Sequence, residues 1–169
     1  MNELTDDNGN KIPIIFRPFH ETINLVNEPT TSSGFWWNWS TDEEYKEVYK
    51  LLVNRLRATC DNLLFVYNPL LTSTTSTSEN LLLSRYPGDD YIDMIGVDLY
   101  EKHFKNFSNG IFGLCNLYST IASITKKHNK IHYIPEIGNF KGEDPDFFNE
   151  VIKFFDKIGN VPIALTWNN

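Results

Sequence analysis

Five short apolar segments recur along this 169-residue chain, and they constrain its fold more than any other feature. Each segment is almost continuously hydrophobic, as expected of parallel strands that are covered on both faces. The segments are IPIIF at 12–16, LLFVY at 63–67, DMIGV at 93–97, IHYIP at 131–135 and VPIAL at 161–165. Because helical patterns separate most of them, they predict an α/β fold with a parallel sheet.

Amphipathic helices are predicted between these strands. The first begins after Thr41, which forms a capping box with Glu44, and its apolar side chains then recur every three or four residues. A second helix is predicted over about 111–128, where the last turn is rich in lysine. The order of strands and helices is therefore that of consecutive βα units.

The third helix and one loop are marked by their local sequence. Asp144 is the expected N-cap of the helix, Pro145 its first residue and Gly159 its stop signal. The stretch TSTTSTSEN at 72–80 holds only small or polar residues that cannot build a core. We expect an exposed, mobile loop there.

Composition excludes several kinds of partner. The net charge of −7 and the pI near 5.0 argue against nucleic acid, whose binding needs a basic surface. No apolar run approaches the ~20 residues that span a bilayer, so we expect no membrane partner. The start of the chain, MNELTDDNGNK, lacks the basic and then apolar pattern of a signal peptide.

Polar or aromatic residues follow each predicted strand, in the sequences RPFHE, YNP, VDLY, PEIGN and TWNN. In parallel α/β proteins these strand ends converge on the ligand site. Glu21 and Glu136 are the only glutamates that directly end apolar strands. Two carboxyl groups brought together in this way suit cleavage of a glycosidic bond, where one acts as acid and the other as nucleophile or base.

A cluster of aromatic residues, GFWWNW at 34–39, follows the first strand end and holds three of the four tryptophans. Indole rings are good platforms for the apolar faces of sugar rings. Alternatively, one or two of these rings simply close the loop onto the core. The sequence leaves open which of Trp36, Trp37 and Trp39 contacts a sugar.

The ordered set of RPFHE, the Trp-rich loop, YPGDDYIDMIGVDLY, IPEIG and ALTWNN resembles glycoside hydrolase family 26, which is best known for endo-β-1,4-mannanases. The resemblance covers residues 12–169. It implies a (β/α)8 TIM barrel of which this chain supplies the portion corresponding to strands 4–8. Residues 1–169 would then be a partial catalytic domain from which the first three βα units are absent.

The resemblance also implies roles for individual residues. Glu21 matches the acid/base and Glu136 the nucleophile of a retaining mechanism, which places the two carboxyl groups ~5–5.5 Å apart. Tyr100 matches a tyrosine that hydrogen-bonds near the nucleophile. The residues expected to bind substrate are His20, Trp36, Trp37, Tyr100 and Trp167.

Several polar residues near the strand ends have more than one plausible role. Arg17 is expected to pair with a neighbouring carboxylate rather than to bind a sugar or a phosphate. His20 has no second His or Cys at ligand spacing, so we expect a structural or substrate-orienting role for it. We expect no metal and no cofactor. At most one of Asp98 and Tyr100 is expected to point into the barrel mouth.

Three functions fit these residues: a retaining hydrolase of β-mannan, a related β-glucan or β-xylan hydrolase, or a truncated, catalytically idle sugar-binding remnant. For the full-length protein, the resemblance implies a secreted or cell-surface location and a polysaccharide substrate. The first and last strands would be exposed edges, which are open to association. We therefore expect the missing amino-terminal barrel half, or self-association, to cover them.

Overall fold

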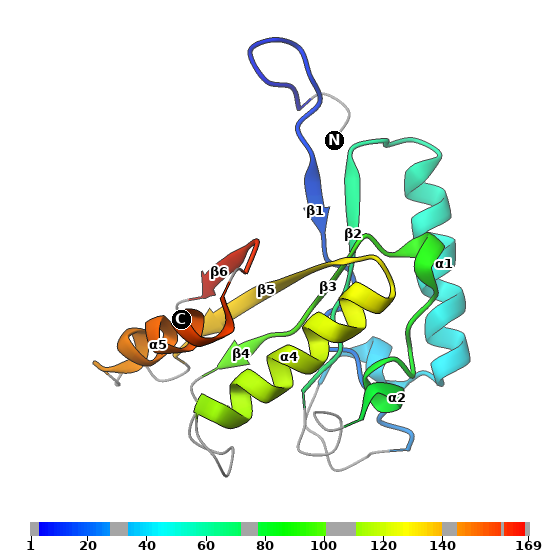
Figure 1. The fold of residues 1–169 in the computed structure, drawn as a ribbon. Helices are drawn as coiled ribbons and strands as arrows, with labels where there is room; N and C mark the ends of the chain where they lie inside the picture. Colours follow the sequence, from blue (N-terminus) through cyan, green and yellow to red (C-terminus); the bar gives the residue numbers. More distant parts are fainter. Residues whose placement is uncertain are drawn as a thin grey trace.

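The computed structural model describes residues 4–27, 34–71, 78–100, 111–139, 145–159 and 161–167. Within these residues one parallel sheet runs through the molecule (Figure 1). Its strands are β1 (Ile14–Phe16), β2 (Leu63–Tyr67), β3 (Met94–Gly96), β4 (Leu99–Tyr100), β5 (Ile131–Gly138) and β6 (Ala164–Trp167).

The strands pair in the order β1-β2-β3-β5-β4, and β6 pairs with β5. β1 pairs with β2, β2 with β3, and β3 with the first half of β5. The second half of β5 lies between β4 and β6. Because β3 and β4 pair with the same side of β5 one after the other, they act as one interrupted strand.

All five predicted strands are present, although only β2 has the predicted bounds, and β3 is shorter than the predicted 93–97. β1 begins at Ile14 rather than at residue 12. β5 continues to Gly138, so Glu136 lies within the strand instead of directly after it. The last strand covers Ala164–Trp167 rather than 161–165.

Three long helices connect these strands: α1 (Asp42–Arg57), α4 (Ile111–Lys127) and α5 (Phe147–Ile158). The predicted capping box of α1 is confirmed. The Glu44 amide donates to Thr41 Oγ1 at 3.3 Å, and the Thr41 amide donates to Glu44 Oε2 at 2.9 Å. α4 packs against β3, β5 and α5, so the helices cover one face of the sheet (Figure 1).

Two local predictions need correction. α5 begins at Phe147 with Asp146 as its N-cap, so Pro145 is not its first residue, and Asp144 lies outside the described residues. Ser78 caps the short helix α2 (Glu79–Leu82) by accepting from the Leu81 amide at 3.4 Å. The predicted loop is therefore wrong at residues 78–80, while 72–77 lie outside the described residues.

The main hydrophobic core lies between the sheet and the helices. In β2, Leu63, Phe65 and Tyr67 face this core, whereas Leu64 and Val66 belong to a second cluster on the other face. The alternation is that of a strand whose neighbouring side chains point to opposite sides. The second cluster is small and contains Val66, Met94 and Tyr133, with Leu64 and Ile163 against it.

The two end strands of the sheet are its most exposed part. Every residue of β6 is exposed, including Leu165 and Trp167, and Ile15 in the middle of β1 is exposed as well. Closing a barrel would cover such edges. Among the described residues, no helix is both long enough and apolar enough to cross a membrane.

Candidate active site

Glu136 lies near the carboxyl end of β5, where side chains from three strands meet. Its side chain is only 13% exposed, and both of its oxygens accept hydrogen bonds. Oε1 accepts from Arg17 Nη2, and Oε2 accepts from the hydroxyl of Tyr100. Arg17 directly follows β1 and Tyr100 ends β4, so the sheet itself brings both donors to this carboxylate.

Arg17 also links two further strand ends. Its Nη1 donates to Asn68 Oδ1 at 2.7 Å and to the two oxygens of Asp98 at 3.1 and 3.0 Å. Asn68 in turn donates to the carbonyl of Gly96 at 3.1 Å. The prediction that Arg17 pairs with a carboxylate is confirmed, and it pairs with two.

The expectation that only one of Asp98 and Tyr100 faces the barrel mouth is wrong. Asp98 binds Arg17, Tyr100 binds Glu136, and Arg17 and Glu136 bind each other, so both residues belong to one cluster. The physical reason is that residues two apart on an extended chain point to the same side.

The charge of Glu136 is fixed by its partners. Burial alone would raise the pKa of this carboxyl, but the hydrogen bonds from Tyr100 and Arg17 and the positive charge of Arg17 hold it below its ordinary value. Glu136 is therefore ionised at neutral pH, which is the form that a nucleophile or a general base requires.

The pKa of Asp98 is shifted in the opposite direction to that of Glu136. Burial raises the pKa of Asp98 to about 8, and the negative charges of Glu136 and Glu21 add to this, while Arg17 opposes it. A single guanidinium is shared between two carboxyl groups here. Because burial outweighs the charge of Arg17, the neutral form of Asp98 persists to a much higher pH than in a free carboxyl group.

Glu21 lies in the connection after β1, and its backbone is unusual. Its φ is +49°, and that of Phe19 is +52°, both in the left-handed region that residues other than glycine rarely adopt. Such a conformation persists only where the surroundings hold it. The fully buried Asn38 does so, because its amide donates to the Glu21 carbonyl at 3.0 Å and accepts from the Ile23 amide at 2.9 Å.

His20 and the aromatic cluster lie next to Glu21. The His20 carbonyl accepts from Trp37 Nε1 at 3.0 Å, and the His20 ring lies 4.6 Å from that of Phe35. Phe35 and Trp37 stack with their centroids 4.5 Å apart. Burial and the charge of Arg17 lower the pKa of His20, so its imidazole is neutral at neutral pH.

The tryptophans of the predicted platform differ in exposure. Trp36 and Trp39, in the 3-10 helix η1 (Trp36–Trp39), are 68% and 59% exposed, whereas Trp37 is partly buried against the core. Trp167 in β6 is half exposed. Its carbonyl lies so close to Gly138 that an added Cβ there would stand 2.5 Å away, so β5 and β6 can approach only at glycine.

Both predicted carboxylates lie in one electrostatic neighbourhood. Burial is the main cause that raises the pKa of Asp98 and of Tyr100, and the negative charges of Glu136 and Glu21 raise both pKa values further. In the described part of the chain, no group of three or more His, Cys, Asp and Glu side chains is arranged to hold a metal ion. The sequence did not identify Asn38 or Asn68 as parts of this site, and it offered Asp98 only as an alternative to Tyr100.

Parallel strands that bring two glutamates toward one edge of the sheet, beside exposed indoles, resemble the sites of glycoside hydrolases. The model of glycosyl hydrolase family 26 matches residues 1–161. This chain therefore belongs to glycosyl hydrolase family 26, as its sequence motifs predict.

Characterised relatives carry a consistent name. A mannan endo-1,4-beta-mannosidase of Bifidobacterium adolescentis is 29% identical, with an alignment that covers 95% of this chain and 17% of the relative. A mannan endo-1,4-beta-mannosidase of Bacillus subtilis is 31% identical over 57% of this chain and 26% of the relative. The chain thus spans about a quarter or less of these relatives.

Solved structures of this family share the fold. A GH26 β-mannanase from Bacteroides ovatus is 30% identical and superimposes with a TM-score of 0.76, covering 98% of this chain and 45% of its own. An endo-β-1,4-mannanase from Cellulomonas fimi is 27% identical with a TM-score of 0.79, covering 96% and 36%. The predicted fold, part of a (β/α)8 barrel, is confirmed.

Proposed function

We propose that this chain supplies both catalytic carboxyl groups of a retaining glycoside hydrolase that cleaves β-1,4-mannosidic bonds. The observation that carries the proposal is the setting of Glu136, whose two oxygens are held by Arg17 and Tyr100 and whose pKa is low. A carboxylate held in this way keeps its charge and its direction. The names of the relatives favour mannan as the polymer.

In the first step, Glu136 attacks the anomeric carbon while Glu21 donates its proton to the glycosidic oxygen. The bond to the leaving sugar breaks, and a covalent glycosyl-enzyme ester forms at Glu136. In the second step, Glu21 takes a proton from water, the water oxygen bonds to the anomeric carbon, and the ester bond to Glu136 breaks. Glu21 is protonated again at the end, so the cycle is complete.

Five side chains are proposed to hold the polysaccharide: His20, Trp36, Trp37, Tyr100 and Trp167. Exposed indoles suit the apolar faces of sugar rings. The neutral imidazole of His20 can both donate to and accept from a sugar hydroxyl. Because a polymer is cut where it lies, we also propose that the complete protein works outside the cell or on its surface.

We further propose that three preceding βα units complete the barrel by pairing with β1 and β6. The exposed residues of both end strands support this, because in a closed barrel each strand has two neighbours. Residues 1–169 alone are then expected to be inactive or weakly active. A monomer of these residues that unfolds cooperatively and hydrolyses mannan at rates usual for glycosidases would contradict this, whereas rescue by an added amino-terminal half-barrel supports it.

The experiment that tests the activity is a substrate panel on the complete barrel. Release of reducing sugar is measured from β-mannan, lichenan and β-1,3-xylan, with Glu136→Gln as the inactive control. Proton NMR of the first-formed product shows whether the β-anomer is retained. Preference for lichenan or xylan would assign the related hydrolase, and binding without any hydrolysis would assign an idle sugar-binding domain.

A further inference from the structure

Arg85 is the largest fully buried side chain among the described residues, and the catalytic steps above do not use it. It lies between α2 and the 3-10 helix η3 (Asp89–Tyr91), far along the chain from Glu21. Its Nε donates to Asp42 Oδ1 at 2.9 Å, and its guanidinium carbon lies 5.1 Å from the centre of the Tyr45 ring. A buried cation with a carboxylate and an aromatic face is well compensated, so the cost of burying it is offset.

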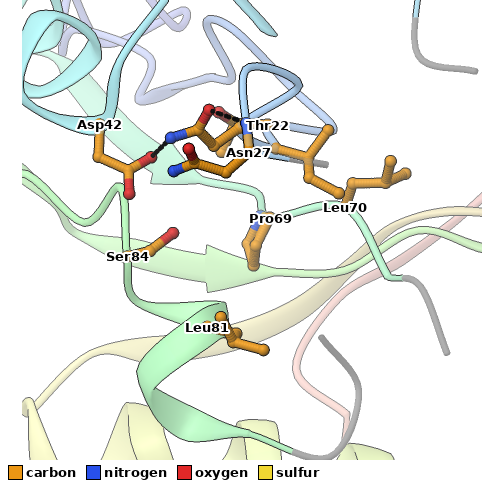
Figure 2. Close-up of a pocket in the computed structure, with 9 residues that line it drawn as sticks. Thr22, Asn27, Asp42, Pro69, Leu70, Leu81 and Ser84 are labelled. Carbon is orange, nitrogen blue, oxygen red and sulfur yellow. Dashed lines mark hydrogen bonds between the residues drawn. The ribbon is translucent and has the colours of Figure 1, made fainter. Parts of the chain in front are cut away.

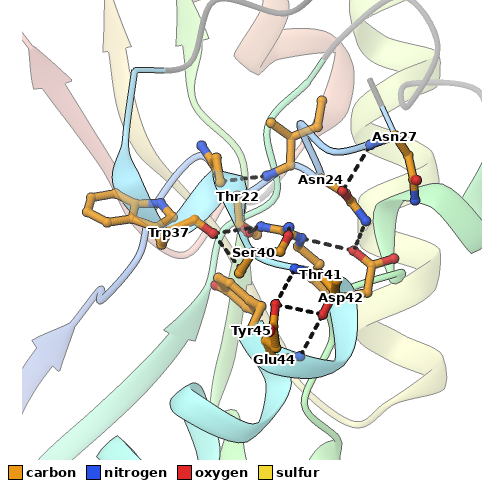
Figure 3. A network of polar contacts seen from close by, with 12 residues as sticks. Thr22, Asn24, Asn27, Trp37, Ser40, Thr41, Asp42, Glu44 and Tyr45 are labelled. Carbon is orange, nitrogen blue, oxygen red and sulfur yellow. Dashed lines mark hydrogen bonds and ion pairs between the residues drawn. The ribbon is translucent and has the colours of Figure 1, made fainter. Parts of the chain in front are cut away.

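The remaining donors of Arg85 converge on the segment that carries the tryptophans. Nη1 donates to the Trp37 carbonyl at 3.0 Å, and Nη2 donates to the Ser40 carbonyl. Figure 3 shows Trp37 and Ser40 in one network of polar contacts with Thr22 and Asp42. These carbonyls belong to the end of η1, where a helix leaves its last acceptors without internal donors. Arg85 therefore holds η1 at its carboxyl end.

The same side chain reaches the residue after Glu21. Arg85 Nη1 donates to Thr22 Oγ1 at 3.3 Å. Two side chains of η1 bind the backbone at Glu21 and at the residue before it. Trp37 Nε1 donates to the His20 carbonyl, and Asn38 donates to the Glu21 carbonyl. Arg85 thus acts on both sides of Glu21, directly through Thr22 and indirectly through η1.

The backbone around Glu21 is strained, which explains why it needs the contacts that Arg85 makes with Thr22 and η1. Glu21 and Phe19 both have a positive φ, a conformation that is strained for residues other than glycine. The segment would relax if its neighbours moved apart. A guanidinium carries five donors in one rigid plane and can hold several acceptors at fixed positions, whereas an ammonium is a single point charge.

A ligand site is the other reading of these polar groups, since Thr22, Asn24 and Asp42 line a pocket beside Ser84 (Figure 2). The pocket has a volume of about 80 Å³. Pockets that bind small molecules usually measure about 300–1,000 Å³, so this one is small for a ligand site. Asp42 Oδ1 is also occupied by Arg85 and by Asn24, which donates to it at 3.0 Å.

We propose that Arg85 is a positioning residue that holds Glu21 in line with the glycosidic oxygen by bracing Thr22 and η1 from behind. The inference rests on the proposed function, in which Glu21 is the acid/base. It assigns Arg85 no contact with substrate. Its effect is therefore confined to the step in which the proton of Glu21 moves.

The test is Arg85→Lys, assayed in the form of the protein that is active on mannan. Two substrates are compared, mannan and an aryl β-mannobioside with a dinitrophenol leaving group, which departs without protonation. We expect kcat/KM for mannan to fall roughly 10- to 100-fold, the size of effect that a displacement of about 1 Å produces. We expect the aryl substrate to lose less than ~3-fold, because its leaving group needs no general acid.

The ratio of the two kcat/KM values decides the outcome, because it does not depend on how much of the variant is folded. An equal loss on both substrates overturns the proposal. The matched control is Arg55→Lys, at an exposed position on α1, which is expected to leave the ratio unchanged. Should Arg85→Lys yield no soluble protein, Thr22→Val removes the acceptor next to Glu21 and is expected to move the ratio in the same direction; an unchanged ratio overturns the proposal.

Failure of this inference is distinguishable from failure of the proposed function. Glu21→Ala must itself show the selective loss on mannan if Glu21 is the acid/base. If Glu21→Ala shows it and Arg85→Lys does not, only the role of Arg85 is wrong. If neither variant shows it, the assignment of Glu21 fails first.

Discussion

The two glutamates of the site are held in different ways. Glu136 lies within a strand, and side chains from other strands bind both of its oxygens. Glu21 lies in a connection, and its main chain is fixed by Trp37 and Asn38, which donate to the carbonyls of His20 and of Glu21 itself. The described contacts thus act on the charged oxygens of Glu136 and on the backbone of Glu21.

This difference in contacts shows how one site can give two carboxyl groups different chemical roles. Donors on the carboxylate itself stabilise the anion, which suits a group that must stay ionised and attack. Contacts on the backbone fix the direction of the side chain without determining its protonation state. That arrangement suits a group that must give up a proton and later take one back.

The largest effect is expected at Glu136. Glu136→Gln keeps the shape of the side chain but removes the nucleophile, so kcat on every substrate should fall roughly 10⁴-fold or more. The measurement is turnover of mannan and of the dinitrophenyl substrate. Substantial turnover of either one would remove Glu136 from the role of nucleophile.

Glu21→Ala should separate the two substrates. Loss of a general acid typically costs about 10²- to 10⁴-fold, and we expect a loss of this size on mannan. The first, glycosylating step on the dinitrophenyl substrate should be spared, which is measured as a burst of dinitrophenol. Equal losses on both substrates would contradict the difference in role between the two glutamates.

Tyr100→Phe tests whether the hydrogen bonds to Glu136 set its charge. Losing one donor raises the pKa of Glu136, so the acidic limb of the kcat/KM profile should move to higher pH, with a loss of roughly 10- to 100-fold in rate. The control is Tyr86→Phe, whose hydroxyl binds Asp89 at an exposed position. An unshifted acidic limb would show that Arg17 alone fixes the charge.

The smallest effect is expected on stability at Asp98. The folded pKa of about 8 lies above the ordinary value of 3.8, so the stability contributed by its neutral form is full below about pH 4 and is lost as pH rises through 8. Glu136 acts in the opposite sense, with stability present above its ordinary pKa of 4.5 and lost as pH falls below it.

Asp98→Asn removes the first of these contributions. Relative to the wild type, the free energy of unfolding of this variant should therefore rise by at least ~1 kcal/mol between pH 4 and pH 8. Urea unfolding at several pH values measures it, with the exposed Asp90→Asn as control. A difference that does not change with pH would mean that Asp98 is ionised throughout.

Much of the fold was predictable because each element has a local cause. The apolar run at 63–67 is covered on both faces, and Thr41 with Glu44 caps a helix within four residues of sequence. The bounds predicted for the last strand were wrong because VPIAL and ALTW overlap, and hydrophobicity alone does not distinguish the two segments. α2 was missed because a helix of four residues is too short to show a period.

The site was predictable only in part, for a different reason. Glu21 and Glu136 stand at strand ends, where position alone indicates a role. The role of Arg85 could not be predicted because its hydrogen-bond acceptors come from separate segments of the chain. The lone arginine within the apolar stretch LLLSRY nevertheless indicates that it has buried polar partners. The bond between Arg17 and Asp98 likewise depends on the order of strands in the sheet rather than on sequence spacing.

The fully buried Asn38 has a consequence for protein engineering. One amide side chain ties Glu21 and Ile23 to η1, while the Asn38 carbonyl accepts from the Leu25 amide at 2.9 Å. Grafting RPFHE onto another barrel therefore transfers Glu21 without the residues of η1 that hold its backbone. The smallest portable unit joins residues 17–25 to η1 and Arg85, and a chimera that exchanges one piece without the others inherits a glutamate aimed in the wrong direction.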